Sequence, residues 1–431
     1  MKKIKVLSVV LALLMLVSAF VGCDKDQQST NETESQTEVR TEAETEAASL
    51  MLNGVALEDY TIVYAAVGTG GGKKAAEYLN QKFSELYGVE LQMEAKRQDR
   101  PEILIGHDNG DAAIIAAYKE HPTGLIGISG KKIVLLGANA SAHCMLVDAF
   151  LAKAKAEESG ASISVTACEF PEIKLDSLKV MSYNILGNMD IEGRPADARE
   201  QMVQTILDND IDVIGTQEDN EENRGVFVNL LGNYDSYIGS GSDNYIYWKK
   251  EKFNLIKKGY YYLSDTPGKE SKYEDSTQYR TLTYVILEIK ETGKQLMFVA
   301  THLDYRSSEA TRVKQINVLA SKIKDINKNG LPVILVGDFN SLPTQSNGAI
   351  PNFLAKNSDF VMTSRVALEK GDTGESLVSR SDFATRYHGV FDYIFVSVDN
   401  VCTKYYSIVT NMTNGKYPSD HLPVLAQIDI Y

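Results

Sequence analysis

The chain has 431 residues, a net charge of -14, 43% hydrophobic and 24% charged residues. These are ordinary globular values, and the length predicts two or three domains. They exclude a disordered protein, a collagen, a small disulfide scaffold and a polytopic membrane protein. The acidic balance argues against a protein that grips nucleic acid through a broad basic face.

The N-terminus has the order of an export signal. Three lysines precede an apolar run over residues 6–17, and small residues follow, as in a secretory signal. The run is shorter than the ~20 apolar residues that span a membrane. The sequence FVGC at 20–23 resembles a bacterial lipobox, which implies cleavage before Cys23 and a diacylglycerol on its thiol. The alternative is a plain secretory signal with an incidental cysteine.

We therefore expect a lipoprotein signal peptide over residues 1–22 and a protein held by lipid on the extracytoplasmic face of a bacterial cell membrane. Two acyl chains would give stable anchoring. Residues 24–50 carry eight acids and two bases and almost no large apolar group. Such a segment cannot offset its ordering entropy, so residues 23–50 are predicted to be a disordered acidic tether.

Residues 51–171 are predicted to form an accessory α/β domain. Strands are expected at 60–64, 102–106 and 127–137, the last with a central turn, and helices at 75–87 and 143–155. The glycine-rich run at 68–72 lacks the ending of a P-loop and the GxGxxG spacing, which favours a strand-to-helix connection. The pattern resembles small α/β domains that precede the catalytic domains of some secreted glycoside hydrolases, and this implies packing or ligand presentation.

The cysteines and the first three histidines give no metal-binding pattern. Cys144 and Cys168 could pair in an exported protein, or they could be buried and unpaired, and the sequence leaves both open. No CxxC motif or Cys/His cluster indicates zinc. The histidines at 107, 121 and 143 lack ligand spacing and are interpreted as structural or exposed.

From residue 176 onward, short apolar strands carry polar residues at their ends. These polar residues are Asn184, Glu218, His302, Asp304, Asp338, Asn340, Asp392, Asp420 and His421. Rigid scaffolds often present reactive side chains at such ends. The set offers hard-metal ligands and acid–base groups, without a thiolate nucleophile or a G-x-S-x-G elbow. It suits hydrolysis at phosphorus, with a carboxylate-held Mg²⁺ neutralising phosphate oxygens.

At this point the sequence resembles the endonuclease/exonuclease/phosphatase family, over residues 176–431. The motifs stand in family order as SYNIL (182–186), TQE (216–218), THLD (301–304), GDFN (337–340), DYIF (392–395) and SDHLPV (419–424). The resemblance implies an α/β class overall, with a C-terminal DNase I-like two-sheet β-sandwich flanked by helices as the catalytic domain. It also implies a metal-dependent phosphoric ester hydrolase.

The resemblance implies roles for the motif residues. Glu218 would be the main Mg²⁺ ligand, with Asn184 and Asp420 beside the metal, and Mn²⁺ could replace Mg²⁺. Asp338 and Asn340 would position or activate the attacking water. The remaining roles fall to His421, which would contact the scissile phosphate, to Asp392, which would orient that ring, and to His302, which would assist at the phosphate or leaving group. Which group is the general base stays open.

Several softer matches complete the prediction. Arg280 lies where the family often has an arginine facing the phosphate, and a surface salt bridge is the alternative. A helix is expected over residues 307–326, capped by Ser308. Trp248 and the tyrosines at 245, 247 and 260–262 are interpreted as core packing, with stacking on a base or sugar as the alternative.

The predicted function is extracytoplasmic hydrolysis of a phosphomonoester or phosphodiester by in-line water attack. Nucleic acid, lipid headgroups and small phosphorylated sugars or polyols stay open as substrates, and no protein partner or oligomeric state is inferred. Residues 171–431 carry 28 bases and 35 acids, which favours a compact ester over long DNA. The alternatives are a secreted nuclease acting on DNA or RNA, a silent binding lipoprotein of the same fold, and a carbohydrate enzyme.

Overall fold

The computed structural model describes residues 51–431 apart from 66–71, 154, 158–159, 164–166, 188–190, 220–226 and 388. The predicted signal peptide, lipidation site and tether, and nearly all of the glycine-rich run, lie outside the described residues. Within the described residues, no helix has the length and apolar character needed to cross a membrane. The boundary between the accessory and catalytic domains stays a prediction.

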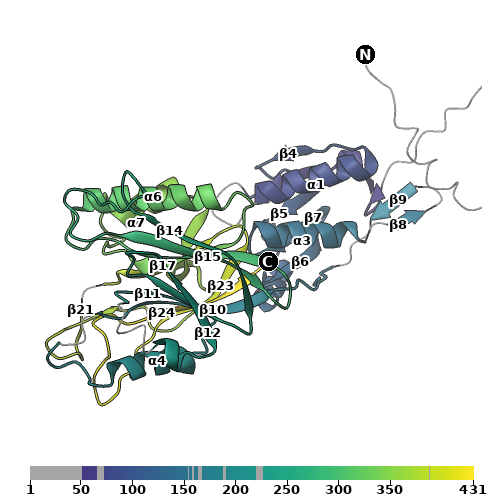
Figure 1. Ribbon diagram of the computed structural model, residues 1–431. Coiled ribbons are helices and arrows are strands. Elements are labelled where there is room, and N and C mark those ends of the chain that lie inside the picture. The colour runs from purple at the N-terminus through teal and green to yellow at the C-terminus, as the bar shows by residue number, and fades with distance from the viewer. Residues whose placement is uncertain are drawn as a thin grey trace, which may run out of the picture. The chain divides into compact units, whose positions relative to one another are not determined.

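Two large mixed sheets form the C-terminal region (Figure 1). The first has seven strands in the order β12 (Tyr234–Ile238), β13 (Tyr245–Lys249), β11 (Val213–Gln217), β10 (Asp176–Asn184), β24 (Val424–Ile430), β23 (Val401–Ile408) and β19 (Glu369–Lys370). The second has six strands in the order β14 (Phe253–Tyr262), β15 (Thr281–Ile289), β16 (Gln295–His302), β17 (Val333–Asp338), β22 (Asp392–Ser397) and β18 (Phe360–Met362).

Successive side chains of a strand point to opposite faces of the sheet, so each strand contributes to two hydrophobic cores. On β10, Leu178 and Val180 face the opposite sheet in the central core, whereas Met181 and Tyr183 face outward into a separate buried cluster. On β16, Phe298 belongs to the central core, and its neighbours on the strand pack outward. Because both faces of these strands are buried, their sequences are nearly continuous runs of apolar residues.

Helices cover the outer faces of the two sheets. The helix α4 (Ala198–Asp208) packs on the seven-stranded sheet, while α6 (Glu309–Ile326) and α7 (Ala349–Lys356) lie over the six-stranded sheet (Figure 1). A single turn, α8 (Thr363–Val366), follows β18. The predicted cap is confirmed, since Ser308 Oγ accepts a hydrogen bond from Thr311 N (3.2 Å). These layers form the two-sheet sandwich flanked by helices that the sequence predicted.

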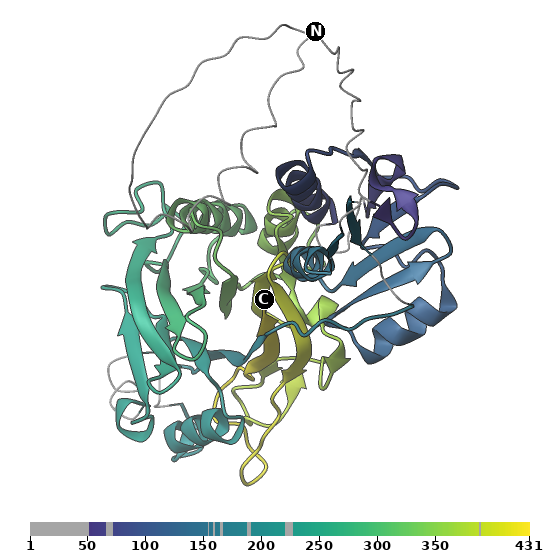
Figure 2. The same cartoon turned by 90° about the vertical axis from the view of Figure 1, so that its right-hand side faces the viewer.

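The N-terminal region is a smaller α/β unit, as predicted. Its five-stranded sheet has the order β4 (Gln92–Glu94), β3 (Thr61–Tyr64), β5 (Glu102–Ile105), β7 (Lys132–Gly137) and β6 (Gly124–Ser129). Two helices, α1 (Gly72–Tyr87) and α3 (Ala140–Leu151), pack on one face and α2 (Ala112–Glu120) on the other (Figure 2). A four-stranded sheet contains β1 (Met51–Leu52), β2 (Val55–Ala56), β8 (Lys155–Glu157) and β9 (Gly160–Ile163), and a single 3-10 turn, η1 (Leu57–Asp59), lies between β2 and β3.

In this region the bounds of α3 differ from the prediction, and the three described cysteines of the chain are unpaired. The helix predicted over residues 143–155 is α3. It begins three residues earlier than predicted because Asn139 caps it, accepting a hydrogen bond from Ala142 N (2.9 Å), and it ends four residues earlier, at Leu151. Cys144, Cys168 and Cys402 are free thiols, so Cys144 and Cys168 do not form a disulfide. Cys402 is partly buried, and burial raises the pKa of its thiol, as expected for a cysteine of low reactivity.

Candidate active site

Strand register brings the predicted residues to one place. The parallel strands β10 and β11 end side by side, with Asn184 opposite Gln217. In the second sheet, His302 at the end of β16 lies opposite Asp338 at the end of β17, and Asp338 lies opposite Asp392 at the start of β22. The ends of the two sheets therefore supply the predicted set from neighbouring positions.

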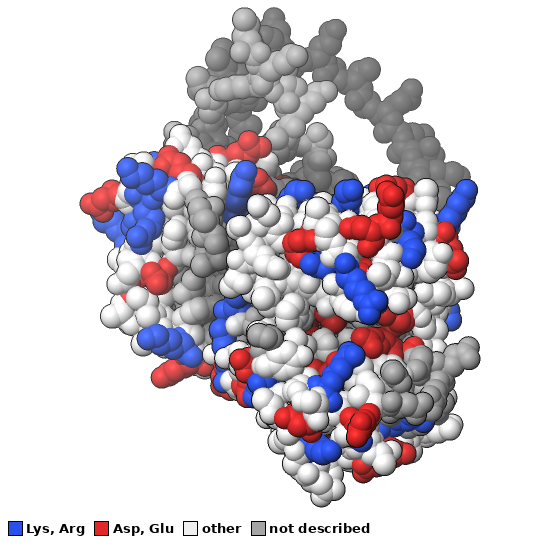
Figure 3. All heavy atoms as spheres, turned by 90° about the vertical axis from the view of Figure 1, so that its left-hand side faces the viewer, with Lys and Arg blue, Asp and Glu red and all other residues white. Residues whose placement is uncertain are grey.

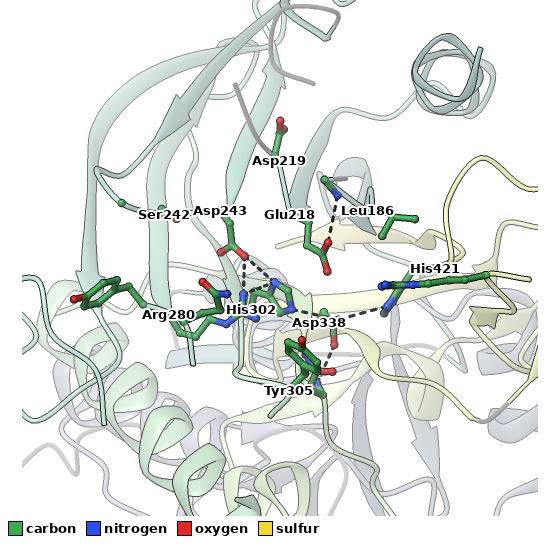
Figure 4. A pocket seen from close by; sticks show the side chains of 16 residues that line it. Leu186, Glu218, Asp219, Ser242, Asp243, Arg280, His302, Tyr305, Asp338 and His421 are labelled. Carbon is green, nitrogen blue, oxygen red and sulfur yellow. Dashed lines mark hydrogen bonds and ion pairs between the residues drawn. The ribbon is translucent and has the colours of Figure 1, made fainter. Parts of the chain in front are cut away.

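A cavity of about 620 Å³ opens at these strand ends (Figure 4). The predicted residues that line it are Glu218, Arg280, His302, Asp338, Asn340 and His421. Asn184, Asp392 and Asp420 stand behind this lining and are hydrogen-bonded to it. Nine of the ten predicted residues, all but Asp304, thus form one connected site.

Asn184 joins two carboxylates at the floor of the cavity. Its Nδ2 donates to Glu218 Oε1 (3.2 Å) and to Asp338 Oδ2 (3.1 Å), and its Oδ1 accepts from Leu186 N (3.1 Å). Glu218 has a φ of 57°, a left-handed conformation that is uncommon for a residue with a side chain. The other oxygen of Glu218 accepts from Gly187 N (3.3 Å). The backbone therefore holds a strained position and aims this carboxylate into the site.

The chemistry of the donors fits a hard divalent cation. Ser419 Oγ donates to Asn184 O (2.8 Å), which ties the segment bearing Asp420 to the end of β10. Asp420 Oδ1 is buried and has no hydrogen-bond partner among the described residues. A buried, orphaned carboxylate oxygen beside Glu218 and Asn184 is what a Mg²⁺ ligand set offers.

A second group with metal-ligand chemistry lies next to the first. Asp338, Asp392 and His421 each have a ligand atom within 4.8 Å of the others. One oxygen of Asp392, Oδ1, is also buried without a partner in the described part of the chain. The site therefore has more acidic oxygens than its own donors satisfy.

His421 is held by a carboxylate. Its Nδ1 lies 2.7 Å from Asp392 Oδ2, and its Nε2 lies 3.7 Å from Asp338 Oδ2. Burial alone would lower the pKa of His421, but the Asp392 and Asp338 carboxylates outweigh it and hold that pKa well above its ordinary range. This environment favours the protonated form of the ring, which would place positive charge on the cavity wall.

His302 has a different partner, which the sequence did not indicate. Its Nδ1 lies 2.9 Å from Asp243 Oδ2, and its Nε2 lies 3.5 Å from Asp338 Oδ2 (Figure 4). Arg280 Nη1 donates to the same Asp243 oxygen (2.6 Å). Burial would raise the pKa of Asp243, but Arg280 and His302 lower it to about 2.

Arg280 is a buried residue, so the surface salt bridge that was an alternative for it is wrong. Its side chain is 4% exposed, and its Nη1 also lies 2.8 Å from His302 Nδ1. The guanidinium lines the cavity, and its Nη1 contacts both members of the Asp243–His302 pair. Its first effect is to hold that pair in place.

Asp338 is the centre of the arrangement. Its Oδ1 accepts from Asn340 N (2.9 Å), which leaves Oδ2 facing the amide of Asn184 and the Nε2 atoms of His302 and His421. Asn340 has a φ of 44°, and its Nδ2 donates to Leu303 O (3.0 Å). The turn after β17 is thereby fixed beneath the cavity.

Other predicted residues have structural roles. Asp304 accepts hydrogen bonds from the backbone of residues 277, 278, 306 and 307, so it organises loops and does not enter the cavity. Tyr245, Tyr247, Trp248 and Tyr262 are buried, as the core-packing interpretation predicted, whereas Tyr260 and Tyr261 are only partly buried.

Sequence reasoning did not single out nine residues of the lining: Gly187, Asp219, Gly241, Ser242, Asp243, Gln278, Tyr279, Tyr305 and Arg380. All lie in connecting segments, where no periodicity marks a position. The glycines and serines around Asp243 indicate a turn, but nothing in the sequence indicates that this turn meets His302.

Comparison with known proteins identifies the class of this site. A sequence model of the endonuclease/exonuclease/phosphatase family matches residues 181–421, and the chain belongs to this family. Its members are hydrolases that act on phosphoesters. No curated protein matched the chain in a sequence search.

Solved structures share the fold of the C-terminal region. An endonuclease/exonuclease/phosphatase family protein from Bacteroides thetaiotaomicron is 24% identical, with a TM-score of 0.53 over 60% of this chain and 100% of that one. A mannosyl-6-phosphatase from the same organism is 24% identical, with a TM-score of 0.52 over 58% and 99%. A protein of unknown function from Enterococcus faecalis is 20% identical, with a TM-score of 0.52 over 59% and 100%. These likenesses establish the DNase I-like fold.

Proposed function

We propose that this protein is a Mg²⁺-dependent phosphoesterase that hydrolyses a compact phosphoester by in-line attack of water. The observation that carries the proposal is the position of Asp338 Oδ2, which lies 3.5 Å from His302 Nε2 and 3.7 Å from His421 Nε2. Each histidine is backed by its own carboxylate, Asp243 or Asp392. A carboxylate oxygen placed between two oriented imidazole rings can accept a proton, and the rings can stabilise developing charge, all within one cavity.

The residues divide the chemistry between them. Asp338 and Asn340 orient the water, and Asp338 Oδ2 accepts its proton as the oxygen attacks phosphorus. His421, as a cation, stabilises the charge that grows on the phosphate oxygens, and His302 assists at the leaving oxygen. Glu218, Asn184 and Asp420 would hold the metal ion, which when bound supplies neutralisation of phosphate oxygens.

The surface favours a compact substrate. Figure 3 shows the face on which β21 (Arg386–Tyr387) lies in Figure 1, and its basic side chains are scattered among acidic and uncharged ones instead of forming a continuous band among the coloured residues. Duplex binding draws mainly on neutralisation of many phosphates, which such a surface does not offer. Tyr279 and Tyr305 line the cavity and are 44% and 51% exposed, so their rings can contact a sugar or polyol. The mannosyl-6-phosphatase of similar fold agrees with this choice.

We also propose that the protein acts outside the cytoplasm on a lipid anchor at Cys23. The support is the signal-like N-terminus and its FVGC ending. Labelling of expressing bacteria with a palmitate analogue should mark the wild type and not a Cys23→Ala variant. Equal labelling of both would overturn the anchor and leave the enzyme proposal intact.

A substrate screen tests the enzymatic proposal. Purified residues 24–431 are offered sugar and polyol phosphates, simple phosphodiesters, phospholipids, a short single strand and plasmid DNA, with Mg²⁺ or EDTA. We expect turnover of a small ester with Mg²⁺ and none in EDTA. Plasmid DNA cut orders of magnitude faster than every small ester would identify a nuclease instead, and no turnover of any ester would favour a silent binding protein.

A further inference from the structure

Arg380 reaches the cavity from a hairpin that is joined to the catalytic segment. The hairpin consists of β20 (Leu377–Val378) and β21 (Arg386–Tyr387). Val378 N donates to Asp420 O (2.7 Å), and Leu422 N donates to Ser376 O (2.7 Å). The hairpin and the segment bearing Asp420 and His421 are therefore one hydrogen-bonded unit, and Arg380 is fixed relative to both.

Only one nitrogen of the Arg380 guanidinium has a hydrogen-bond partner among the described residues. Its Nε donates to Asp420 Oδ2, while Asp420 Oδ1 stays without a hydrogen-bond partner in the described structure. Nη1 and Nη2 of Arg380 have no partner among the described residues, and the side chain is 56% exposed while it lines the cavity. The negative charges of Asp420 and Glu218 both act on this guanidinium, which places it beside the expected metal ligands.

Arg380 differs in this respect from the other arginine of the cavity. Arg280 is 4% exposed, and its Nη1 is engaged with Asp243 and His302. Within the described lining, Arg380 is thus the guanidinium whose two terminal nitrogens remain open to a ligand. A planar pair of N–H donors matches two oxygens of one phosphate.

The charge of the substrate determines how strongly an additional guanidinium stabilises its binding. A phosphomonoester carries about -1.5 to -2 charge at neutral pH because its second pKa is ~6, whereas a phosphodiester carries one charge. A monoester also presents three terminal oxygens, one more than a diester. An additional cation beside the metal ligands therefore favours the monoester.

We propose that Arg380 is a substrate-binding residue that clamps the terminal phosphate of a phosphomonoester dianion and makes the site selective for monoesters over diesters. The inference rests on the proposed phosphoesterase function. It assigns the specificity of that function to a residue of the β20–β21 hairpin, outside the family motifs.

The test compares p-nitrophenyl phosphate with bis(p-nitrophenyl) phosphate in the wild type, Arg380→Ala and Arg380→Lys. For Arg380→Ala we expect kcat/KM for the monoester to fall roughly tenfold to a hundredfold, the range for a hydrogen bond between charged groups. The diester value should fall by less than about threefold, since it has less charge to neutralise. Arg380→Lys should recover part of the monoester rate. Arg386→Ala is the matched control, because that arginine lies in the same hairpin and pairs with Asp372 (2.7 and 2.8 Å).

Calorimetric titration of inorganic phosphate in the presence of Mg²⁺ gives a readout apart from turnover. We expect the affinity to weaken by a similar factor in Arg380→Ala and to stay unchanged in Arg386→Ala. An equal loss for both esters, with a higher Mg²⁺ requirement, would show that Arg380 only braces Asp420 and would overturn the inference. Unchanged kinetics in a folded Arg380→Ala protein, or a wild type that prefers the diester, would also overturn it. A wild type inactive on both esters and on the wider screen would instead refute the proposed function.

Discussion

His302 and Asp338 are direct neighbours across the parallel strands β16 and β17, and this register places His302 Nε2 3.5 Å from Asp338 Oδ2. Both residues are the last of their strands, so the contact is set by the pairing of two buried elements and not by a loop. A scaffold of this kind holds reacting groups with little freedom, which is what positioned acid–base chemistry requires.

The Asp243–His302 contact should matter for turnover. Asp243→Asn keeps the shape of the side chain and removes the charge that holds His302 Nδ1 at 2.9 Å. We expect kcat to fall roughly a hundredfold, the lower end for a positioned proton-transfer group, with little change in KM. The NMR signal of His302 Nδ1 should shift between the wild type and the variant, because its contact with the carboxylate is lost. Asp235→Asn, at an exposed position, is the control, and an unchanged signal and kcat would contradict this role.

Metal binding should depend on Glu218. The Glu218→Gln substitution removes a carboxylate oxygen, the ligand type that Mg²⁺ prefers. The Mg²⁺ concentration for half-maximal activity should rise roughly tenfold or more, and titration calorimetry should show the same loss of affinity. Glu251→Gln, at an exposed position, should leave both unchanged. Wild-type affinity for Mg²⁺ in Glu218→Gln would place the ion elsewhere.

Acid stability should depend on Asp275, which accepts hydrogen bonds from Ser308 N (3.0 Å), Ser308 Oγ (2.8 Å) and Thr311 Oγ1 (2.7 Å) at the start of α6. These bonds hold the pKa of Asp275 at about 2, below its ordinary value of 3.8. A lowered pKa stabilises the fold above the ordinary value, and this stabilisation is lost as the pH falls from 3.8 towards 2. Asp275→Asn should therefore lower the melting temperature at pH 7, and its difference from wild type should shrink below pH 4.

The same series of melting curves includes Glu274→Gln, whose exposed side chain is adjacent in the chain. This control should follow the wild type at every pH. A gap between Asp275→Asn and wild type that stays constant from pH 7 to pH 3 would show that the ionised carboxylate does not stabilise the helix.

The packing of the two sheets should be sensitive to the addition of a side chain at Gly215. A Cβ added there would lie 2.4 Å from Val336 Cγ2 and 3.0 Å from Ala300 Cβ. Gly215→Ala should reduce the free energy of unfolding by about 1–3 kcal/mol, as overpacking does in a filled core. Gly232→Ala, where nothing lies within 4 Å, should have a small effect. Denaturant unfolding measures both, and equal effects would contradict the close approach of the sheets.

The strand-end residues could be predicted from sequence because their position is local. A buried strand is a short apolar run, and the polar residue that ends it, such as Glu218 or Asp338, stands beside it in the chain. Parallel pairing then brings the ends together. The helix at 309–326 was predictable for the same reason, since its cap and its apolar period are both local signals.

Asp243 and Arg380 could not be predicted in this way. Asp243 contacts His302, which lies 59 residues further along the chain, and Arg380 contacts Asp420, which lies 40 residues further along. Both lie in loops, whose sequences carry no period, and a single acidic or basic residue in a loop is normally solvated. Only the tertiary fold turns these two residues toward the cavity.

The most direct test of the central claim is the rate of phosphate release from the best small ester by wild-type protein and by Asp338→Asn, at saturating Mg²⁺. Asp338 Oδ2 lies between both histidines, so loss of its charge should lower kcat roughly a hundredfold or more while the melting temperature stays close to wild type. Asp359→Asn, an exposed position, should release phosphate at the wild-type rate. A folded Asp338→Asn protein with wild-type kcat would contradict the account.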